Sequence, residues 1–317
     1  MIHQKPPTNA RELLRKYWGI SSFRPLQEKI IRDVVQGKDV LGIMTTGGGK
    51  SLTYQISGLL RPGLCIVVSP LISLMIDQFE GLRKRAIPSV MIHSGMTARQ
   101  IENAWSSIQF NKTKFVFLSP ERLQTKAFKA LYPKLNIGLL VVDEAHCISE
   151  WGHDFRPEYR NIFSNIQKID KNVKITALTA TATPAVRKDI ADILQLESPR
   201  IFVTGFARSN LRFTVTHAKS DQEKDEELTR FISSTSGSGI IYAATRKRCE
   251  ELANWLPEKT RRPIGAYHAG LEPSQRQRVQ DDFMAGRLSA IVATNAFGMG
   301  IDKADIRFVV HYNIPGS

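Results

Sequence analysis

The sequence contains little cysteine and no long apolar run. Its three cysteines, Cys65, Cys147 and Cys249, stand far apart, which excludes a disulfide framework and a four-cysteine zinc site. We therefore expect each to be a small buried hydrophobic side chain in a reducing compartment. No apolar run approaches the ~20 residues that span a bilayer, and residues 1–10 lack the hydrophobic segment of a signal peptide. The expected location is the cytoplasm, without contact to a membrane.

Acidic residues are scarce beside basic ones. The chain has 44 Lys and Arg against 30 Asp and Glu, a formal net charge of +14. Such an excess favours a polyanionic partner, with nucleic acid as the first candidate, although a solvated basic surface explains the charge as well. Hydrophobic residues make up 42% of the 317 positions, which excludes disordered and fibrous classes, and this length is natural for two domains.

The most informative stretch covers residues 40–57, VLGIMTTGGGKSLTYQIS. It combines a short apolar strand, a turn of three glycines at residues 47–49 and the start of a helix. In a phosphate-binding loop the amide groups surround the phosphates, Lys50 reaches the terminal ones, and Ser51 takes Mg²⁺. The pattern G-x-x-x-x-G-K-[ST] has its first glycine where this chain has Met44, so a glycine-rich turn between core elements stays open as the alternative.

Short apolar runs alternate with helical patterns along the whole chain. Strands are expected at residues 40–44, 64–68, 90–92, 115–118, 137–142 and 173–178, and again at 240–243, 265–267, 290–293 and 308–310. Helices are expected between them, including residues 27–35, 71–79, 98–110, 185–196 and 274–286. The alternation predicts an α/β fold with mostly parallel sheets covered on both faces. A pause at residues 201–212 separates two lobes, which we assign to residues 1–207 and 208–317.

Two acidic residues directly follow the strand expected at residues 137–142. Ligand crevices in open α/β sheets lie at the carboxyl ends of the strands, so Asp143 and Glu144 should face the same edge as the glycine loop. Asp143 can then hold Mg²⁺ through its water shell while Glu144 orients the attacking water. The alternative is a pair of acids solvated at a strand end.

Taken in order, the motifs resemble those of the two-lobed motor core of the RecQ family of ATP-dependent DNA helicases, from about Leu14 to the last residue. FRPLQ resembles the family's adenine-reading segment, TTGGGKS its phosphate loop, and SPLISLMIDQ and SPERL two DNA-contacting segments. DEAHCISEWGHDFRPEY resembles the Mg²⁺ box fused to an aromatic-rich loop, LTATAT a coupling segment, and ATNAFGMGIDKADIR a second-lobe motif touching DNA and nucleotide. The resemblance implies two tandem RecA-like P-loop lobes with mostly parallel sheets, the second lacking its C-terminal part.

The resemblance also implies roles residue by residue. Catalysis is implied for Lys50, Asp143 and Glu144, with Mg²⁺ held by Ser51 and Asp143, largely through water. Nucleotide contacts are implied for Arg24, Gln27, Thr46, Gly47, Gly48, Gly49, Lys50, Ser51 and Asp302. Coupling of the nucleotide site to the DNA site is implied for His146, Thr179 and Thr181. DNA contacts are implied for Ser69, Pro70, Ser119, Arg122, Trp151, His153, Phe155, Arg156, Tyr242, Thr245, Arg246, Thr294 and Asn295.

The aromatic-rich loop gives the resemblance a physical basis. Trp151, His153, Phe155 and Arg156 cluster within six residues, and together they offer a stacking surface and a phosphate partner for a single strand. A DNA strand bound there would be able to shift Glu144. This shift would couple DNA occupancy to hydrolysis. Without the family, such a cluster is more often part of a core than a stacking platform.

The resemblance further implies a motor that uses ATP and Mg²⁺, has no zinc site in this chain, and moves 3′ to 5′ on DNA during repair or recombination. We expect a monomer that binds single strands and duplex/single-strand junctions, nucleoid-associated if its source is bacterial. In the family an arginine beyond the position of Ser317 reaches the γ-phosphate, a contact worth roughly 10³ to 10⁵ in rate. These residues are therefore expected to bind ATP and DNA but to hydrolyse ATP poorly. A nucleotide- and DNA-binding module without turnover and an RNA helicase stay open as alternatives.

Overall fold

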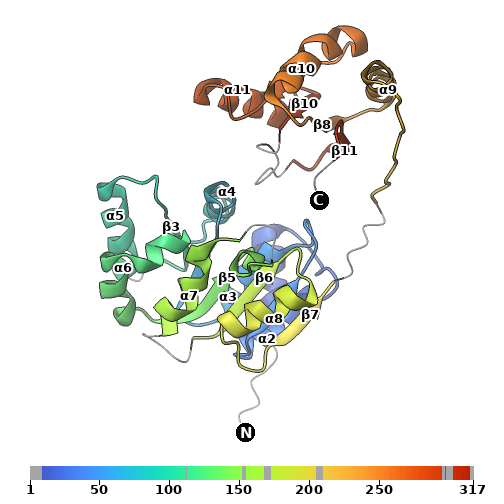
Figure 1. The fold of residues 1–317 in the computed structure, drawn as a ribbon. Helices are drawn as coiled ribbons and strands as arrows, with labels where there is room; N and C mark the ends of the chain where they lie inside the picture. The colour runs from blue at the N-terminus through green and yellow to red at the C-terminus, as the bar shows by residue number, and fades with distance from the viewer. Residues whose placement is uncertain are drawn as a thin grey trace. The chain divides into compact units, whose positions relative to one another are not determined.

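The computed structural model describes residues 9–110, 113–151, 155–167, 173–204, 210–294, 297 and 303–314. Contacts divide the chain into two compact units, Met1–Arg208 and Ser209–Ser317 (Figure 1). Each unit has a parallel sheet of its own, covered by helices. No helix within the described ranges is long and apolar enough to cross a membrane.

The first unit is built on a seven-stranded sheet. Its strands are β1 (Val40–Ile43), β2 (Leu64–Val68), β3 (Ser89–Ile92), β4 (Phe115–Leu118), β5 (Ile137–Val142), β6 (Ile175–Thr179) and β7 (Arg200–Val203). Their order is β3-β4-β2-β5-β6-β1-β7, and every neighbouring pair is parallel. Strand β6 therefore lies between β1 and β5.

Alternate residues along these strands face two separate cores. On β1, Leu41 and Ile43 pack into one hydrophobic cluster, while Val40 packs into the other with Met44 just after it. The cluster around Val40 is covered by α2 (Gln27–Val35), α3 (Lys50–Leu60) and α4 (Ile72–Arg83). The cluster around Leu41 is covered by α5 (Ala98–Gln109), α6 (Lys126–Leu131), α7 (Pro157–Gln167) and α8 (Pro184–Ile193). Because both faces are buried, the strands read as continuous apolar runs.

Short helical turns complete the first unit. At the N-terminal side, α1 (Asn9–Leu13) continues into a π-helical turn, η1 (Leu14–Trp18). It ends at Gly19, whose φ of 67° is the left-handed conformation that commonly closes a helix. Three 3₁₀ turns follow β4, α6 and β5 respectively, namely η2 (Pro120–Gln124), η3 (Tyr132–Lys134) and η4 (Ala145–Ile148).

The second unit has a four-stranded parallel sheet in the order β11-β8-β10-β9. Its strands are β8 (Ser238–Tyr242), β9 (Ile264–Tyr267), β10 (Ala290–Ala293) and β11 (Ile306–His311). The helices α9 (Asp221–Ser234) and α10 (Arg246–Thr260) pack into one core, and α11 (Pro273–Met284) packs into another through Phe283. The predicted α/β fold of two tandem lobes with mostly parallel sheets is confirmed.

The sequence pattern missed two elements near the pause in the alternation. Strand β7 pairs only with β1, at the edge of the first sheet, and Ile201 within it is 53% exposed. Helix α9 begins in the acidic stretch, where the Ser220 hydroxyl accepts the Glu223 N–H at 3.1 Å. Leu228 and Ile232 are its buried residues, so its mostly polar surface hides the helical periodicity.

Candidate active site

Three neighbouring strands of the first sheet end at the same edge. Strand β1 pairs with β6, and β6 with β5, all in parallel, so their carboxyl ends lie side by side. The glycine loop follows β1, Thr179 ends β6, and Asp143 follows β5. The strand order thus brings the glycine loop and the acidic pair to one edge, where α/β sheets bind their ligands.

The glycine loop turns tightly before α3. Gly47 and Gly49 have φ values of 75° and 81°, a left-handed backbone that other residues rarely adopt. A Cβ on Gly48 would stand 2.7 Å from the carbonyl oxygen of Thr45, which already accepts the Gly48 N–H at 2.8 Å. Helix α3 begins at Lys50, so the loop, which includes the predicted Thr46, leads into the N-terminus of an 11-residue helix. Such a terminus attracts phosphate.

Arg24 and Gln27 lie against this loop. The Gln27 amide, 1% exposed, donates to the carbonyl oxygens of Gly48 and Gly49, each at 3.2 Å. Its Oε1 accepts the Arg24 backbone N–H at 2.8 Å, and the Arg24 guanidinium donates to the carbonyl oxygen of Gly47. Gln27 has only two amide hydrogens, so its NH₂ donates to a base edge only after it gives up one of these bonds.

Lys50 and Glu144 form an ion pair at the centre of the edge. Lys50 Nζ lies 3.7 Å from Glu144 Oε1, and the two side chains are 12% and 20% exposed. Glu144 has a φ of 46°, which is uncommon for a residue with a Cβ and often marks a functional constraint. Its backbone N–H donates to Asp143 Oδ1 at 3.0 Å. The two adjacent carboxylates are thus held differently, one by the lysine and one by the backbone of the turn.

Asp143 is 8% exposed, at the end of β5. Burial first, and the charge of Glu144 next, raise the pKa of its carboxyl to about 6, against the opposing effect of Lys50. Asp143 and the Ser51 hydroxyl are the hard oxygen donors that Mg²⁺ prefers. No group of three or more His, Cys, Asp or Glu within the described ranges could hold a metal ion. A Mg²⁺ site completed by water and phosphate needs only one or two carboxylates, so the residues fit this ion.

His146 links the acidic pair to the end of β6. Its Nδ1 lies 2.8 Å from Thr179 Oγ1 and 3.3 Å from Glu144 Oε2. The Thr179 hydroxyl donates to the carbonyl oxygen of Thr181 at 3.1 Å, so the His146 contact assigns the proton to Nδ1. His146 and Thr179 are buried, which excludes solvent from this contact. The three predicted coupling residues therefore form one hydrogen-bonded set.

Among the described residues of the aromatic-rich loop, Trp151 has an exposed ring. Trp151 is 78% exposed, whereas Phe155 is half-buried with the guanidinium of Arg160 5.5 Å from its ring centre. The guanidinium of Arg156, predicted to contact phosphate, donates to the carbonyl oxygen of Pro70 at 2.8 Å. It thereby ties the loop to the segment that follows β2.

The other predicted DNA contacts of the first unit turn their side chains inward. Ser69 is 2% exposed, and its hydroxyl has no hydrogen-bond partner among the residues the structure describes. Ser119 is 4% exposed and its hydroxyl donates to Glu121. Arg122 donates to the carbonyl oxygen of His93 at 2.8 Å. Since β2 and β4 are parallel neighbours, both serines lie at the same sheet edge as the glycine loop.

The predicted DNA contacts of the second unit lie at the carboxyl ends of β8 and β10. The Tyr242 ring stacks on His311 with centroids 5.3 Å apart, and Thr294 donates its N–H to Tyr267 at 3.3 Å. Thr245 caps α10, and Arg246 is exposed at the first turn of that helix. Three predicted residues lie outside the described part of the chain: His153, Asn295 and Asp302.

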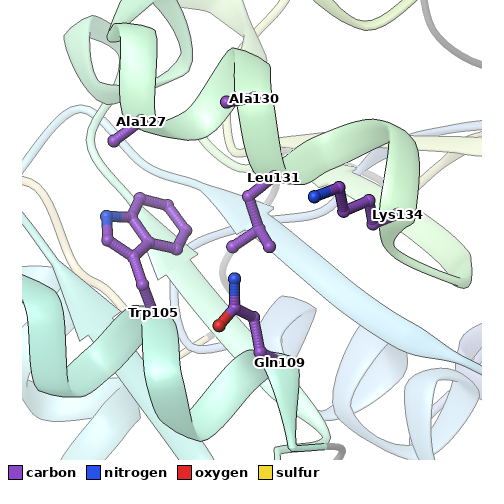
Figure 2. A pocket seen from close by; sticks show the side chains of 6 residues that line it. All are labelled: Trp105, Gln109, Ala127, Ala130, Leu131 and Lys134. Carbon is purple, nitrogen blue, oxygen red and sulfur yellow. The ribbon is translucent and has the colours of Figure 1, made fainter.

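A separate hollow of about 230 Å³ lies between α5 and α6 (Figure 2). Its lining is mostly apolar and consists of Trp105, Gln109, Ala127, Ala130, Leu131 and Lys134. None of the predicted site residues lines it, so it takes no part in the candidate active site.

Known families match both halves of the chain. Residues 24–190 match the DEAD/DEAH box helicase family, and residues 223–317 match the helicase conserved C-terminal domain. The chain belongs to the DEAD/DEAH box helicases. Within this family its relatives include the ATP-dependent DNA helicase RecQ of Pasteurella multocida, 42% identical over 318 residues, which are 100% of this chain and 50% of the relative.

Further helicases support the same placement. The probable ATP-dependent DNA helicase RecS of Bacillus subtilis is 38% identical over 97% of this chain and 62% of its own. The chain thus spans about half to three-fifths of these relatives, and the resemblance to the RecQ family is confirmed. Two solved helicases share the fold. Mycobacterium smegmatis Lhr bound to single-stranded DNA and AMP-PNP has a TM-score of 0.71 and 21% identity, over 97% of this chain and 44% of Lhr. MrfA bound to DNA and AMPPNP has a TM-score of 0.77 and 18% identity, over 98% of this chain and 47% of MrfA.

Several helicase residues around the site were not predicted. The Tyr159 hydroxyl donates to the carbonyl oxygen of Asp143 at 3.1 Å. Ser149 bonds Asp189 of α8 at 2.6 Å. Tyr159 and Ser149 stand inside the quoted motif DEAHCISEWGHDFRPEY, which was the available signal, but no local pattern says which distant residue each one meets.

Proposed function

We propose that this chain is the ATP-driven motor of a RecQ-type DNA helicase, which moves 3′ to 5′ along single-stranded DNA in repair or recombination. One observation carries the proposal: contacts run without a break from Lys50 through Glu144 and His146 to Thr179, beside Asp143. They connect a phosphate-binding lysine to the turn that precedes the exposed Trp151. The match of the whole chain to RecQ helicases supports the same function, and the polarity and setting rest on the family resemblance.

The first unit would bind and cleave the nucleotide. The loop amides and Lys50 bind the phosphates, Arg24 and Gln27 lie beside the base, and Ser51 with Asp143 would hold Mg²⁺, which neutralises phosphate charge when bound. Phosphates give Lys50 a new partner, so its ion pair with Glu144 is exchanged. Glu144 then keeps its contact with His146 and is free to orient a water molecule and accept its proton.

DNA would be held by both units. Trp151 stacks on a base, and the segments containing Ser69, Pro70, Ser119, Arg122, Phe155 and Arg156 lie along the strand. In the second unit Tyr242, Thr245, Arg246 and Thr294 would contact phosphates, and the roles implied for Asn295 and Asp302 stay predictions because both lie outside the described residues. Phosphate contacts position a strand without reading its sequence, as a translocating motor needs. We propose a monomer that binds single strands and duplex/single-strand junctions.

The deciding measurement is ATP hydrolysis with and without single-stranded DNA, on residues 1–317 and on any longer protein that the gene encodes. We expect single-stranded DNA to stimulate hydrolysis. Binding of ATP and DNA without turnover in every form tested would refute the motor. Unwinding of an RNA duplex, with a matched DNA duplex left intact, would refute the DNA substrate.

A further inference from the structure

Ser149 lies at the start of the aromatic-rich loop and is fully buried, with 0% exposure. The Ser149 hydroxyl donates to Asp189 Oδ2 at 2.6 Å, and Ser149 Oγ accepts the backbone N–H of Trp151 at 3.2 Å. Its backbone N–H donates to the carbonyl oxygen of His146 at 3.2 Å. One buried serine therefore joins the peptide of Trp151 to helix α8 and to the turn that contains His146.

The other end of the loop is held to the same turn. The Arg156 N–H donates to the carbonyl oxygen of Cys147 at 2.9 Å, and its guanidinium donates to Pro70 at 2.8 Å. Both anchors thus bond to residues of η4, yet only the Ser149 anchor reaches Trp151 directly. The backbone that carries the exposed Trp151 ring is therefore held in place by Ser149 and Asp189.

Helix α8 is itself tied to the nucleotide edge. It begins after Thr183, whose side chain accepts the Val186 N–H at 3.3 Å, and Thr183 follows Thr181 closely in the chain. Thr181 bonds Thr179, which contacts His146. Asp189 on α8 therefore belongs to the same body as the residues that hold His146.

We propose that Ser149 and Asp189 are positioning residues that fix Trp151 relative to His146. When DNA displaces Trp151, they transmit this displacement through His146 to Glu144. A hydrogen bond from a hydroxyl to a carboxylate is short and strong, so it holds Ser149 and Asp189 at a fixed separation. The inference rests on the proposed function, in which a base of single-stranded DNA stacks on Trp151. Neither residue is among those predicted to contact the nucleotide, so each is proposed to act through the residues it bonds.

The first test is DNA-stimulated hydrolysis by Asp189→Ala and Ser149→Ala. We expect basal hydrolysis and ATP affinity within about twofold of wild type, and stimulation by single-stranded DNA about three- to thirtyfold lower. Asp189→Asn keeps an acceptor for the serine and should give an intermediate value. The matched control is Asp192→Ala, which removes an exposed carboxylate from the same helix and should leave stimulation unchanged. Wild-type stimulation in Asp189→Ala, or equal loss in Asp192→Ala, overturns the proposal.

A second readout needs no turnover. The fluorescence signal of Trp151 is obtained by subtracting the signal of the Trp151→Phe form of each protein from the signal of that protein with Trp151 present. Without DNA, we expect lower Trp151 anisotropy in Asp189→Ala than in wild type, with Asp192→Ala like wild type. Unchanged anisotropy in Asp189→Ala overturns the anchor. If instead DNA neither stimulates wild type nor changes its Trp151 signal, the proposed function fails, and the anisotropy comparison still decides whether Asp189 holds Trp151. Should Ser149→Ala not fold, Asp189→Asn and Asp189→Ala carry both tests.

Discussion

The residues predicted for the site at the carboxyl ends of the strands differ in exposure between the two units. In the first unit Asp143, His146 and Thr179 are 8%, 6% and 0% exposed and belong to one bonded cluster. In the second unit Thr245 and Arg246 follow β8 and are exposed. Bond cleavage benefits from groups fixed away from water, whereas a sliding strand must be met by groups that solvent also reaches. The difference suggests that chemistry belongs to the first edge and backbone contact to the second.

The second unit does contain a polar network, but it joins structural elements. Arg248 of α10 donates to Asp225 of α9 at 2.7 Å and to the Tyr312 hydroxyl, just after β11, at 2.6 Å. Burial opposes its charge, yet hydrogen bonds to Asp225, Tyr312 and Glu251 outweigh it and raise the pKa of the guanidinium. Arg246 lies two positions earlier and is exposed. Arg248 thus joins elements of the fold, whereas the exposed Arg246 beside it is the arginine predicted to contact DNA.

The largest effect should come from Lys50→Ala. The change removes the cation predicted to bind phosphate, which lies 3.7 Å from Glu144, so we expect loss of nucleotide binding and a fall in hydrolysis of roughly 10² to 10³. Titration with a fluorescent ATP analogue and steady-state hydrolysis measure both. Lys84→Ala, an exposed lysine after α4, is the control and should match wild type. Normal ATP affinity in Lys50→Ala would show that the glycine loop is not the phosphate site.

The next largest effect concerns stability and pH. Because folding raises the pKa of Asp143 to about 6 from 3.8, the folded state holds this proton more tightly than the unfolded chain. The resulting stabilisation is complete below about pH 4 and is lost as the pH rises through about 6. Asp143→Asn should therefore raise the unfolding free energy at pH 7.5 by up to about 3 kcal/mol, while impairing hydrolysis.

Denaturant unfolding in EDTA at pH 4 and pH 7.5 checks this expectation, since the gain should vanish at the lower pH. Asp305 of the second unit offers the contrast. A hydrogen bond from Lys303 lowers the pKa of this exposed carboxyl, so Asp305→Asn should act in the opposite direction, with stability lost at neutral pH rather than gained. An equal gain in Asp143→Asn at both pH values would mean that repacking, and not charge, is responsible.

Sequence patterns predicted what depends on local spacing. The glycine loop, the strand that ends at Asp143 and the alternation of both lobes follow from nearest neighbours in the chain, and the structure has them. Contacts between distant segments could not be predicted this way. Gln27 bonds Gly48, and Ser149 bonds Asp189, only because the sheet order brings their elements together. Edge strand β7 was missed although residues 201–203 are apolar, because it lies where the alternation of strands and helices pauses.

Trp151→Ala should have a smaller effect, confined to DNA. Stacking of one base on an aromatic ring is worth about 1–3 kcal/mol, so we expect single-strand affinity to fall by about five- to 150-fold while ATP affinity is unchanged. Fluorescence anisotropy with a labelled oligonucleotide measures it. Phe110→Ala, another exposed aromatic of the first unit at 72% exposure, is the matched control. Equal affinity losses in both variants would point to general surface effects rather than to a stacking site.

The smallest effect should come from Arg246→Ala in the second unit. If this exposed arginine meets one phosphate, its loss weakens DNA binding a few-fold for every sequence alike and lowers the slope of log affinity against log salt by about 0.7 to 1. Binding isotherms at several salt concentrations measure that slope. Lys259→Ala, at the far end of α10, should leave the slope unchanged.

Arg248→Ala should instead lower the unfolding midpoint, because it removes the guanidinium that donates to both carboxylate oxygens of Asp225. If the two arginine variants behaved alike, the division between an exposed residue predicted to contact DNA and a residue that joins elements of the fold would be wrong.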